Sequence, residues 1–169
     1  MMVGLLSRLD RVVGAVCKWG VIACLAGLSA LLLLAVIGRY LPWLSLSGYD
    51  EIIEWLFAWM SFLGALALWR EGALYRVGFL DDLVSGGWKR ALGVFNQALM
   101  LAVALVFTIV GYEFLQAAGE TTPFLGLDKG YWYLAIPATG AFMTLYSLVG
   151  IWRAARGEDT FAEIGAAFS

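Results

Sequence analysis

Four long uncharged stretches constrain this 169-residue sequence more than any other feature. They cover residues 19–38, 55–69, 91–112 and 130–152, and each is predominantly apolar. A helix that crosses a bilayer needs about 20 mostly apolar residues, because an α-helix rises about 1.5 Å per residue. The composition agrees: 62% of the residues are hydrophobic, only 14% are charged, and the mean hydropathy is +0.84. This pattern excludes an ordinary soluble domain.

The sequence therefore predicts an all-α integral membrane protein, a bundle of four transmembrane helices that forms one domain over residues 1–169. The first apolar stretch is longer than the core of a signal peptide, and no small-residue cleavage site follows it, so we expect it to be retained. Residues 2–18 read as an amphipathic lead-in of one or two turns at the membrane surface. Pro137 is expected to kink the last helix. The predicted helices are 19–39, 50–70, 90–113 and 130–152, with a tail over 153–169.

Lysine and arginine residues predict the orientation of the helices. If both termini face the cytoplasm, nine of the eleven basic residues lie on the cytoplasmic side, and only Arg39 and Lys129 lie outside. Short cytoplasmic loops of membrane proteins carry such an excess of positive charge. The nine residues are Arg8, Arg11, Lys18, Arg70, Arg76, Lys89, Arg90, Arg153 and Arg156.

This orientation can be tested with topology reporters. Fusions after Ser45 and after Gly126 should report a periplasmic position, and a fusion after Gly86 should report a cytoplasmic one. A periplasmic signal at Gly86 would contradict the arrangement of four helices.

Three carboxylates stand at the start of the second predicted helix. Asp50 and Glu51 fall in its first turn, where negative charge interacts favourably with the helix dipole. Glu54 lies one turn deeper, on a face with small residues that favours close helix contact. A salt bridge from Arg39 to Glu51 or Glu54 would clamp the first two helices at the outer boundary. Partner recognition and an ion relay are the alternative roles for these acids.

Two tryptophans continue the face next to these acids. Trp55 and Trp59 lie on the helix face that adjoins the face of Glu54, and Trp55 lies near the outer boundary, where aromatic side chains are favoured. The proposed structural or partner-contact residues are therefore Arg39, Asp50, Glu51, Glu54, Trp55 and Trp59.

The residue inventory argues against catalysis and against a bound cofactor or metal. The sequence contains no histidine and only two cysteines, Cys17 and Cys24. The cysteines are seven residues apart on one helix, about 10 Å along its axis, which is too far for a disulfide. We assign both to packing. No phosphate-binding loop, nucleophile motif or metalloprotease motif is present, and the scattered basic residues do not indicate nucleic-acid binding.

The order of several motifs resembles a known family. These motifs are Ile37-Gly38-Arg39-Tyr40, then Asp50-Glu51 before a tryptophan-rich helix, then FLGALALWREG from Phe62, and TTPFLGLDKGYWYLAIPATG from Thr121. Together they resemble the small membrane subunit, of DctQ type, of tripartite ATP-independent periplasmic (TRAP) transporters, over the whole chain. One departure is that Leu74 and Gly78 stand where the family commonly has a histidine and an acid.

The resemblance implies a role in secondary transport. In such complexes a periplasmic substrate-binding protein delivers a solute, typically a carboxylate, to a large membrane subunit that moves it with an ion gradient. The small subunit is expected to brace the large one in the bacterial inner membrane and to contribute to the docking surface, in contact with membrane lipids. The alternatives are a four-helix redox or quinone-linked subunit and a stand-alone small transporter.

Overall fold

A computed structural model describes residues 2–40, 47–71 and 87–156. The described chain is helical between its loops, and four stretches are long and apolar enough to cross a membrane. The all-α fold with four transmembrane helices is therefore confirmed. The helices are α1 (Met2–Tyr40), α2 (Tyr49–Arg70), α4 (Gly87–Ala117), α5 (Gly130–Tyr133) and α6 (Ala135–Arg156), with α5 and α6 together forming the fourth span.

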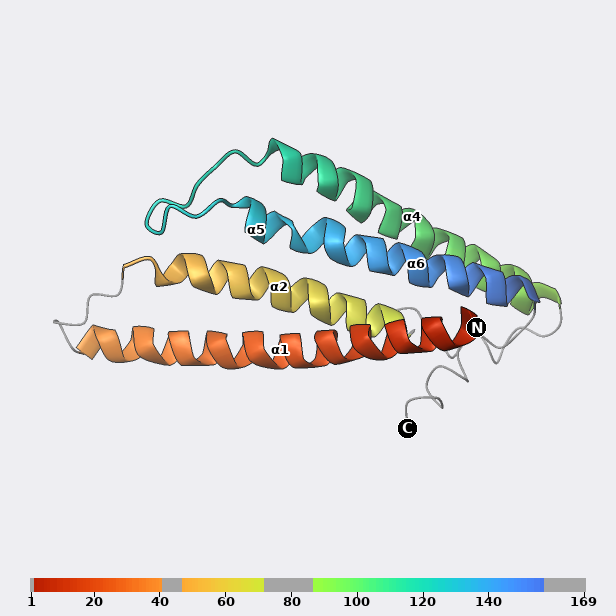
Figure 1. Cartoon of the computed structure of the whole chain (residues 1–169), viewed down its shortest axis with the longest axis horizontal. Coiled ribbons are helices and arrows are strands. Elements are labelled where there is room, and N and C mark those ends of the chain that lie inside the picture. The colour runs from red at the N-terminus through yellow and green to blue at the C-terminus, as the bar shows by residue number, and fades with distance from the viewer. Residues whose placement is uncertain (1, 41–46, 72–86, 157–169) are drawn as a thin grey trace.

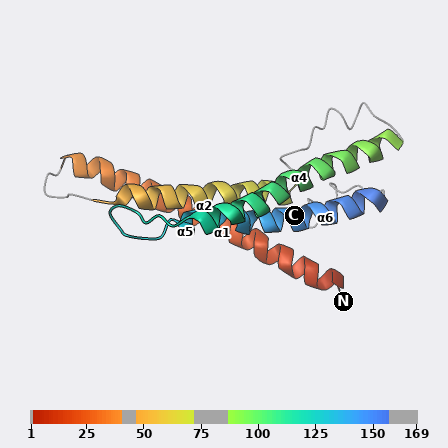
Figure 2. The ribbon, with the colours of Figure 1, turned by 90° about the horizontal axis from the view of Figure 1, so that it is seen from above.

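The four spans form an open row rather than a closed bundle. α1 packs on α2, α2 packs on α6, and α6 packs on α4, so α1 and α4 lie at opposite edges (Figure 1). The row is twisted, because α1 crosses the other helices and its N-terminus diverges from the start of α4 (Figure 2). We call the end with the α4–α5 loop the loop end, and the end that holds Arg70 the terminal end. An open row leaves much apolar surface exposed along its edges and faces.

The lead-in predicted for residues 2–18 is helical and is continuous with the first span. These residues continue α1 without interruption from Met2, so α1 is 39 residues long. The reason is packing: Val13 and Cys17 are buried with Leu66 of α2 in the core, whereas Val12 and Val16 stay exposed. The apolar lead-in is thus divided between a side that contacts α2 and a side that does not.

The other helices lie close to their predicted positions. α2 starts one residue earlier than predicted. α4 starts three residues earlier and ends four residues later than predicted. α6 continues to Arg156, into the start of the predicted tail. The rest of that tail, Leu74 and Gly78, and the fusion sites Ser45 and Gly86 lie outside the described residues.

Pro137 explains why the fourth span consists of two helices. Proline has no backbone N–H, so it cannot donate to the carbonyl of Tyr133 four residues earlier. α5 ends at Tyr133 and α6 begins at Ala135, and the ladder resumes with the N–H of Ala138 donating to Leu134 at 3.2 Å. The predicted kink is therefore present, one turn before the proline.

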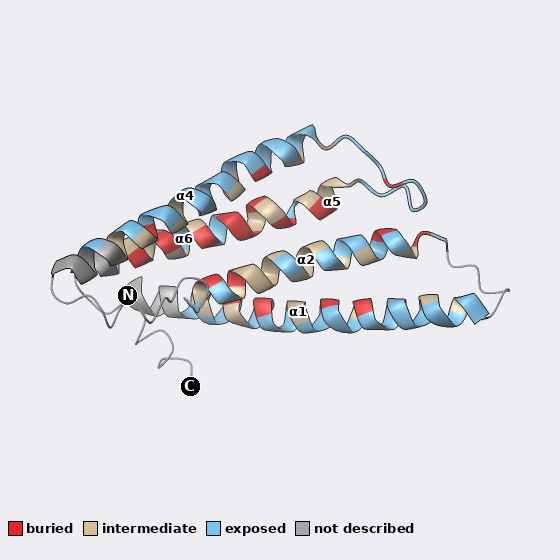
Figure 3. Cartoon of the chain, turned by 180° about the vertical axis from the view of Figure 1, so that it is seen from behind, coloured by how far each residue is buried: buried red, intermediate tan, exposed pale blue. Residues whose placement is uncertain are grey.

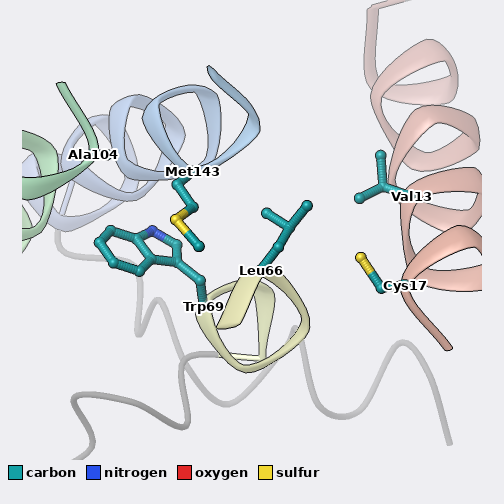
Figure 4. Packing of buried hydrophobic residues seen from close by; sticks show 6 residues of the cluster. All are labelled: Val13, Cys17, Leu66, Trp69, Ala104 and Met143. Atoms are coloured by element: carbon teal, nitrogen blue, oxygen red, sulfur yellow. The ribbon is translucent and has the colours of Figure 1, made fainter. Parts of the chain in front are cut away.

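Buried positions lie where the helices face one another. They follow α6, in the middle of the row, and the side of α1 that faces α2 (Figure 3). At the terminal end, Leu66 lies between the residues from α1 and the residues Trp69, Met143 and Ala104 (Figure 4). The edge-to-face rings of Phe62 and Phe107, whose centroids are 6.2 Å apart, add a contact between α2 and α4. The core therefore joins all four spans.

Glycines set the distance between neighbouring helices. On α1, a Cβ at Gly20 would come within 2.7 Å of Leu63, and one at Gly27 within 3.1 Å of Leu56. The contacts repeat at heptad spacing on both helices, as in left-handed helix pairs. On α6, a Cβ at Gly140 would lie 2.9 Å from the backbone nitrogen of Thr108. Gly140 therefore lets α6 approach the backbone of α4 directly.

Gly140→Ala should destabilise the protein by about 1–3 kcal/mol, because the added methyl group meets backbone atoms, which cannot rotate away. The midpoint and slope of unfolding in a mixed-micelle SDS titration measure this change. Gly93→Ala is the matched control, since nothing lies within 4 Å of its Cβ position and alanine favours the helix. Equal stability of the two variants would contradict the close approach of α4 and α6.

Candidate functional site: two polar ties between the helices

A partly buried ion pair joins three helices at the terminal end. The guanidinium of Arg70, at the end of α2, donates from Nε to Asp10 Oδ1 at 2.5 Å and from Nη2 to Asp10 Oδ2 at 2.9 Å. The hydroxyl of Tyr146 on α6 donates to Asp10 Oδ1 at 2.9 Å. The side chains of Arg70 and Asp10 are only 11% and 18% exposed. We call this group, Asp10, Arg70 and Tyr146, the terminal tie.

Gly14 makes room for this ion pair on α1. A Cβ at this position would lie 2.5 Å from Arg70 Nη1, so the guanidinium rests against the bare backbone of the helix. A bidentate pair of this kind is the geometry in which opposite charges compensate best for lost hydration. The terminal tie therefore fixes α1 and α6 to the end of α2.

Neutral polar groups extend the terminal tie toward α4. The indole of Trp69 donates to Ser147 Oγ at 3.1 Å, which makes a second link between α2 and α6. Gln97 of α4 is buried against Gly150 of α6, whose Cβ position lies 2.8 Å from the amide carbon. Polar side chains from all four spans thus gather at the terminal end.

A carboxylate ties the loop end together. Glu51, in the first turn of α2, accepts the backbone N–H of Phe124 at 2.8 Å and that of Leu125 at 3.0 Å, one on each oxygen. The hydroxyl of Thr122 donates to the same carboxylate. Glu51 and Thr122 are both buried. We call this group, Glu51, Thr122, Phe124 and Leu125, the loop tie; it holds the α4–α5 loop against the start of α2.

Two further contacts support the loop tie. Gly48 has a positive φ of 84°, which L side chains rarely adopt, and its Cβ position lies 3.0 Å from Phe124 Cβ. The indole of Trp59 donates to the carbonyl of Tyr131 at 3.1 Å, so α2 also holds the start of α5.

An exposed ion pair lies at the base of the same loop. Lys129 donates to Glu120 Oε2 at 3.0 Å. This hydrogen bond, together with the negative charges of Glu120 and of nearby Glu54, raises the pKa of Lys129. Lys129 therefore stays positively charged and places Glu54 in a favourable field.

The structure separates the carboxylates that the sequence grouped. Glu51 is in the loop tie, whereas Asp50 and Glu54 are exposed. Of the predicted aromatic contacts, Trp59 is in a hydrogen bond within the chain, and Trp55 is 38% exposed. Sequence reasoning chose Glu51 but not its partners, because hydrogen bonds to backbone N–H groups leave no pattern in side-chain types.

The expected clamp between Arg39 and Glu51 or Glu54 is not formed in the described part of the chain. Its ion pairs there are Arg70 with Asp10 and Lys129 with Glu120, and Arg39 is exposed. The helix register explains this. Since Gly20 and Gly27 face Leu63 and Leu56, Arg39 lies more than one helical turn beyond the start of α2.

Sequence reasoning missed the terminal tie. Its signal was present: Asp10 is the one acid among the basic residues before Trp19, and Arg70 ends the second apolar stretch on the same predicted side. The pairing of Asp10 with Arg70 was predictable on this basis, because each charge near a membrane needs an opposite charge to compensate it. Tyr146 carried no such signal, because a tyrosine in an apolar helix is common.

Cys17 and Cys24 are free thiols, both buried on the side of α1 that faces α2. Within residues 2–40, 47–71 and 87–156, no group of three His, Cys, Asp or Glu residues is placed to hold a metal ion. Among the buried polar groups, Trp69 binds Ser147 and Glu51 binds Thr122.

Fold and site together define a small multi-pass membrane protein whose buried polar groups hold its helices together. Residues 28–157 match the family of tripartite ATP-independent periplasmic transporters, DctQ component. Because the match covers well over half of the chain, the protein belongs to this family: it is a TRAP-type small permease subunit. No curated protein matches the sequence.

The terminal tie can be measured with a double-mutant cycle. Asp10→Ala and Arg70→Ala should each cost about 1–3 kcal/mol, because each leaves the opposite, partly buried charge without its ion-pair partner. The double variant should cost less than the sum, with a coupling of about 0.5–3 kcal/mol in SDS unfolding. Arg11→Ala, at an exposed position one residue along α1, is the control and should be near neutral. Strictly additive losses would show that the two charges do not stabilise each other.

Proposed function

We propose that this subunit is a rigid scaffold for the large membrane subunit of a TRAP-type transporter and adds to the docking surface for a periplasmic substrate-binding protein. The complex would take up a carboxylate-type solute by ion-coupled symport across the bacterial inner membrane. In this assignment the small subunit binds no solute and catalyses no reaction.

The observation that carries the proposal is that the buried polar groups bind other groups within the protein and hold its helices together. The terminal tie and the loop tie hold the row of helices together at both ends. Between them, Thr108 and Thr144 pair across α4 and α6 at 3.2 Å, and Thr139 donates to the carbonyl of Ala135. Polar groups engaged in this way stabilise a fixed shape, which is what a scaffold requires.

The open row supplies the surface for a large partner. In each of the first three membrane-length helices only 11% of the most apolar window is buried, and exposed residues predominate along α1 and α4. Membrane lipids cover part of that surface, and the large subunit is proposed to cover the rest. Helices in lipid associate through packing and interhelical hydrogen bonds, since lipid tails are as apolar as leucine.

The docking surface is assigned to the loop end. Arg39, Asp50 and Glu54 are charged and exposed there, and Trp55 is partly exposed beside them. Because nine of the eleven basic residues are assigned to the opposite side, the loop end is proposed to face the periplasm. Tryptophan and arginine are enriched in protein interfaces, and polar groups form the rim, so Trp55 and Arg39 with the acids around them suit a surface that recognises a partner.

Co-expression with the large subunit tests the proposal. Trp55→Ala and Glu54→Gln should lower recovery of the complex, or raise the concentration of binding protein needed for half-maximal uptake, by roughly three- to ten-fold, since one lost interface contact costs about 1 kcal/mol or more. The readouts are co-purification on a tag carried by the large subunit and sodium-driven uptake into proteoliposomes.

Two matched variants control for nonspecific effects. Trp19→Ala removes an exposed tryptophan nearer the terminal end, and Glu113→Gln neutralises an exposed acid on α4; both should leave assembly and uptake unchanged. Loss of ion coupling in Glu54→Gln with normal assembly would contradict the scaffold role and favour an ion relay. A cofactor absorbance in the purified complex that depends on this subunit would favour the redox alternative.

A further inference from the structure

The backbone donors of the turn formed by Thr122–Leu127 are all satisfied, in part by the turn itself and in part by Glu51. The N–H of Thr122 donates to the carbonyl of Leu127, and the N–H of Gly126 donates to the carbonyl of Thr122. The N–H of Leu127 donates to Thr122 Oγ1. Glu51 accepts the N–H groups of Phe124 and Leu125, and Pro123 has no N–H to satisfy. Every backbone N–H from residue 122 to residue 127 is therefore bonded within the protein.

Three side chains of the same turn are apolar and exposed. Phe124 is 71% exposed, Leu127 is 46% exposed and Leu125 is 42% exposed. No residue from 121 to 127 is charged, and the charged groups, Glu120, Asp128 and Lys129, flank the turn at its base. An apolar tip above a charged base is amphipathic, and such an arrangement suits the boundary between a membrane and water.

The turn also lies at the depth of that boundary. It connects two membrane spans, the one ending at Ala117 and the one starting at Gly130. Its contacts with Gly48 and Glu51 place it beside the first turn of α2, which is itself part of a span. The exposed ring of Tyr131 follows directly along the chain. Aromatic side chains are enriched at this level of membrane proteins.

We propose that the turn Thr122–Leu127 is an interfacial membrane anchor, with Phe124, Leu125 and Leu127 inserted among the lipid headgroups and upper acyl chains. A loop enters such a region at low cost only when its backbone N–H groups need no water. The carboxylate of Glu51 supplies the two acceptors that the turn itself lacks. Glu51 is thus the residue that makes the turn compatible with lipid.

Spin-label accessibility tests this proposal on the full-length chain. In a Cys17→Ala, Cys24→Ala background, nitroxide labels at Phe124→Cys and, separately, Leu127→Cys are measured in nanodiscs of phosphatidylcholine and phosphatidylglycerol. Power saturation with oxygen, which partitions into lipid, and with a water-soluble nickel chelate gives an accessibility ratio. Val103→Cys on the exposed side of α4 is the lipid reference, and Glu120→Cys is the aqueous reference.

The oxygen-to-nickel ratio at both turn positions should be several-fold above that at Glu120 and should approach that at Val103. A ratio equal to that at Glu120 would place the turn in water and overturn the proposal. Exclusion of both reagents, in the chain alone or together with the large subunit, would show that protein covers the turn and would equally overturn it.

The role of Glu51 is tested in the same preparation. Glu51→Gln should lower the ratio at Phe124 toward the aqueous value, because the amide replaces one acceptor by a donor and leaves an N–H of the turn unpaired. Glu113→Gln is the matched control and should leave the ratio unchanged. An unchanged ratio in Glu51→Gln would overturn the assignment of Glu51 as the residue that permits insertion.

Discussion

The pairing of Asp10 with Arg70 is the interaction on which the arrangement of the helices depends most. A charge near hydrocarbon is costly unless it is compensated, so neither residue is stable there alone. Their pair forms only if α1 runs alongside α2 down to the last residue of α2. That requirement makes the apolar lead-in a continuation of α1, places Gly14 under the guanidinium, and brings Tyr146 of α6 to the same carboxylate.

The loop end solves a related problem with different groups. There the charge of Glu51 is compensated chiefly by backbone N–H groups and a hydroxyl, with a smaller contribution from the nearby charge of Lys129. Backbone donors are fixed by the turn, so the carboxylate and the loop order each other. Arg39 is therefore not needed to balance Glu51 and stays available at the surface.

The sequence was sufficient to predict the helices but not the polar contacts that hold them together. Long uncharged stretches predict spans because length and hydrophobicity are set locally, and α2 lies within one residue of its prediction. The continuity of α1 depends instead on Val13 and Cys17 packing against Leu66, which is a tertiary contact. The partner of Glu51 could not be found from residue types, since any residue supplies a backbone N–H. The predicted clamp between Arg39 and Glu51 or Glu54 would join opposite charges, but the register of α1 and α2 places Arg39 beyond the start of α2. Only the contacts of Gly20 and Gly27 with α2 reveal this register.

The length of α1 has a mechanical consequence. At about 1.5 Å per residue its 39 residues extend for about 58 Å, nearly twice the roughly 30 Å of hydrocarbon in a bilayer. The helix must therefore lean strongly, project into water, or both. Its first turns precede Asp10 and diverge from the start of α4 (Figure 2). The ion pair of Asp10 with Arg70 therefore holds α1 to α2 next to these turns. A force on these first turns would reach α2 through the pair of Asp10 with Arg70 and through the packing of Val13 and Cys17 against Leu66.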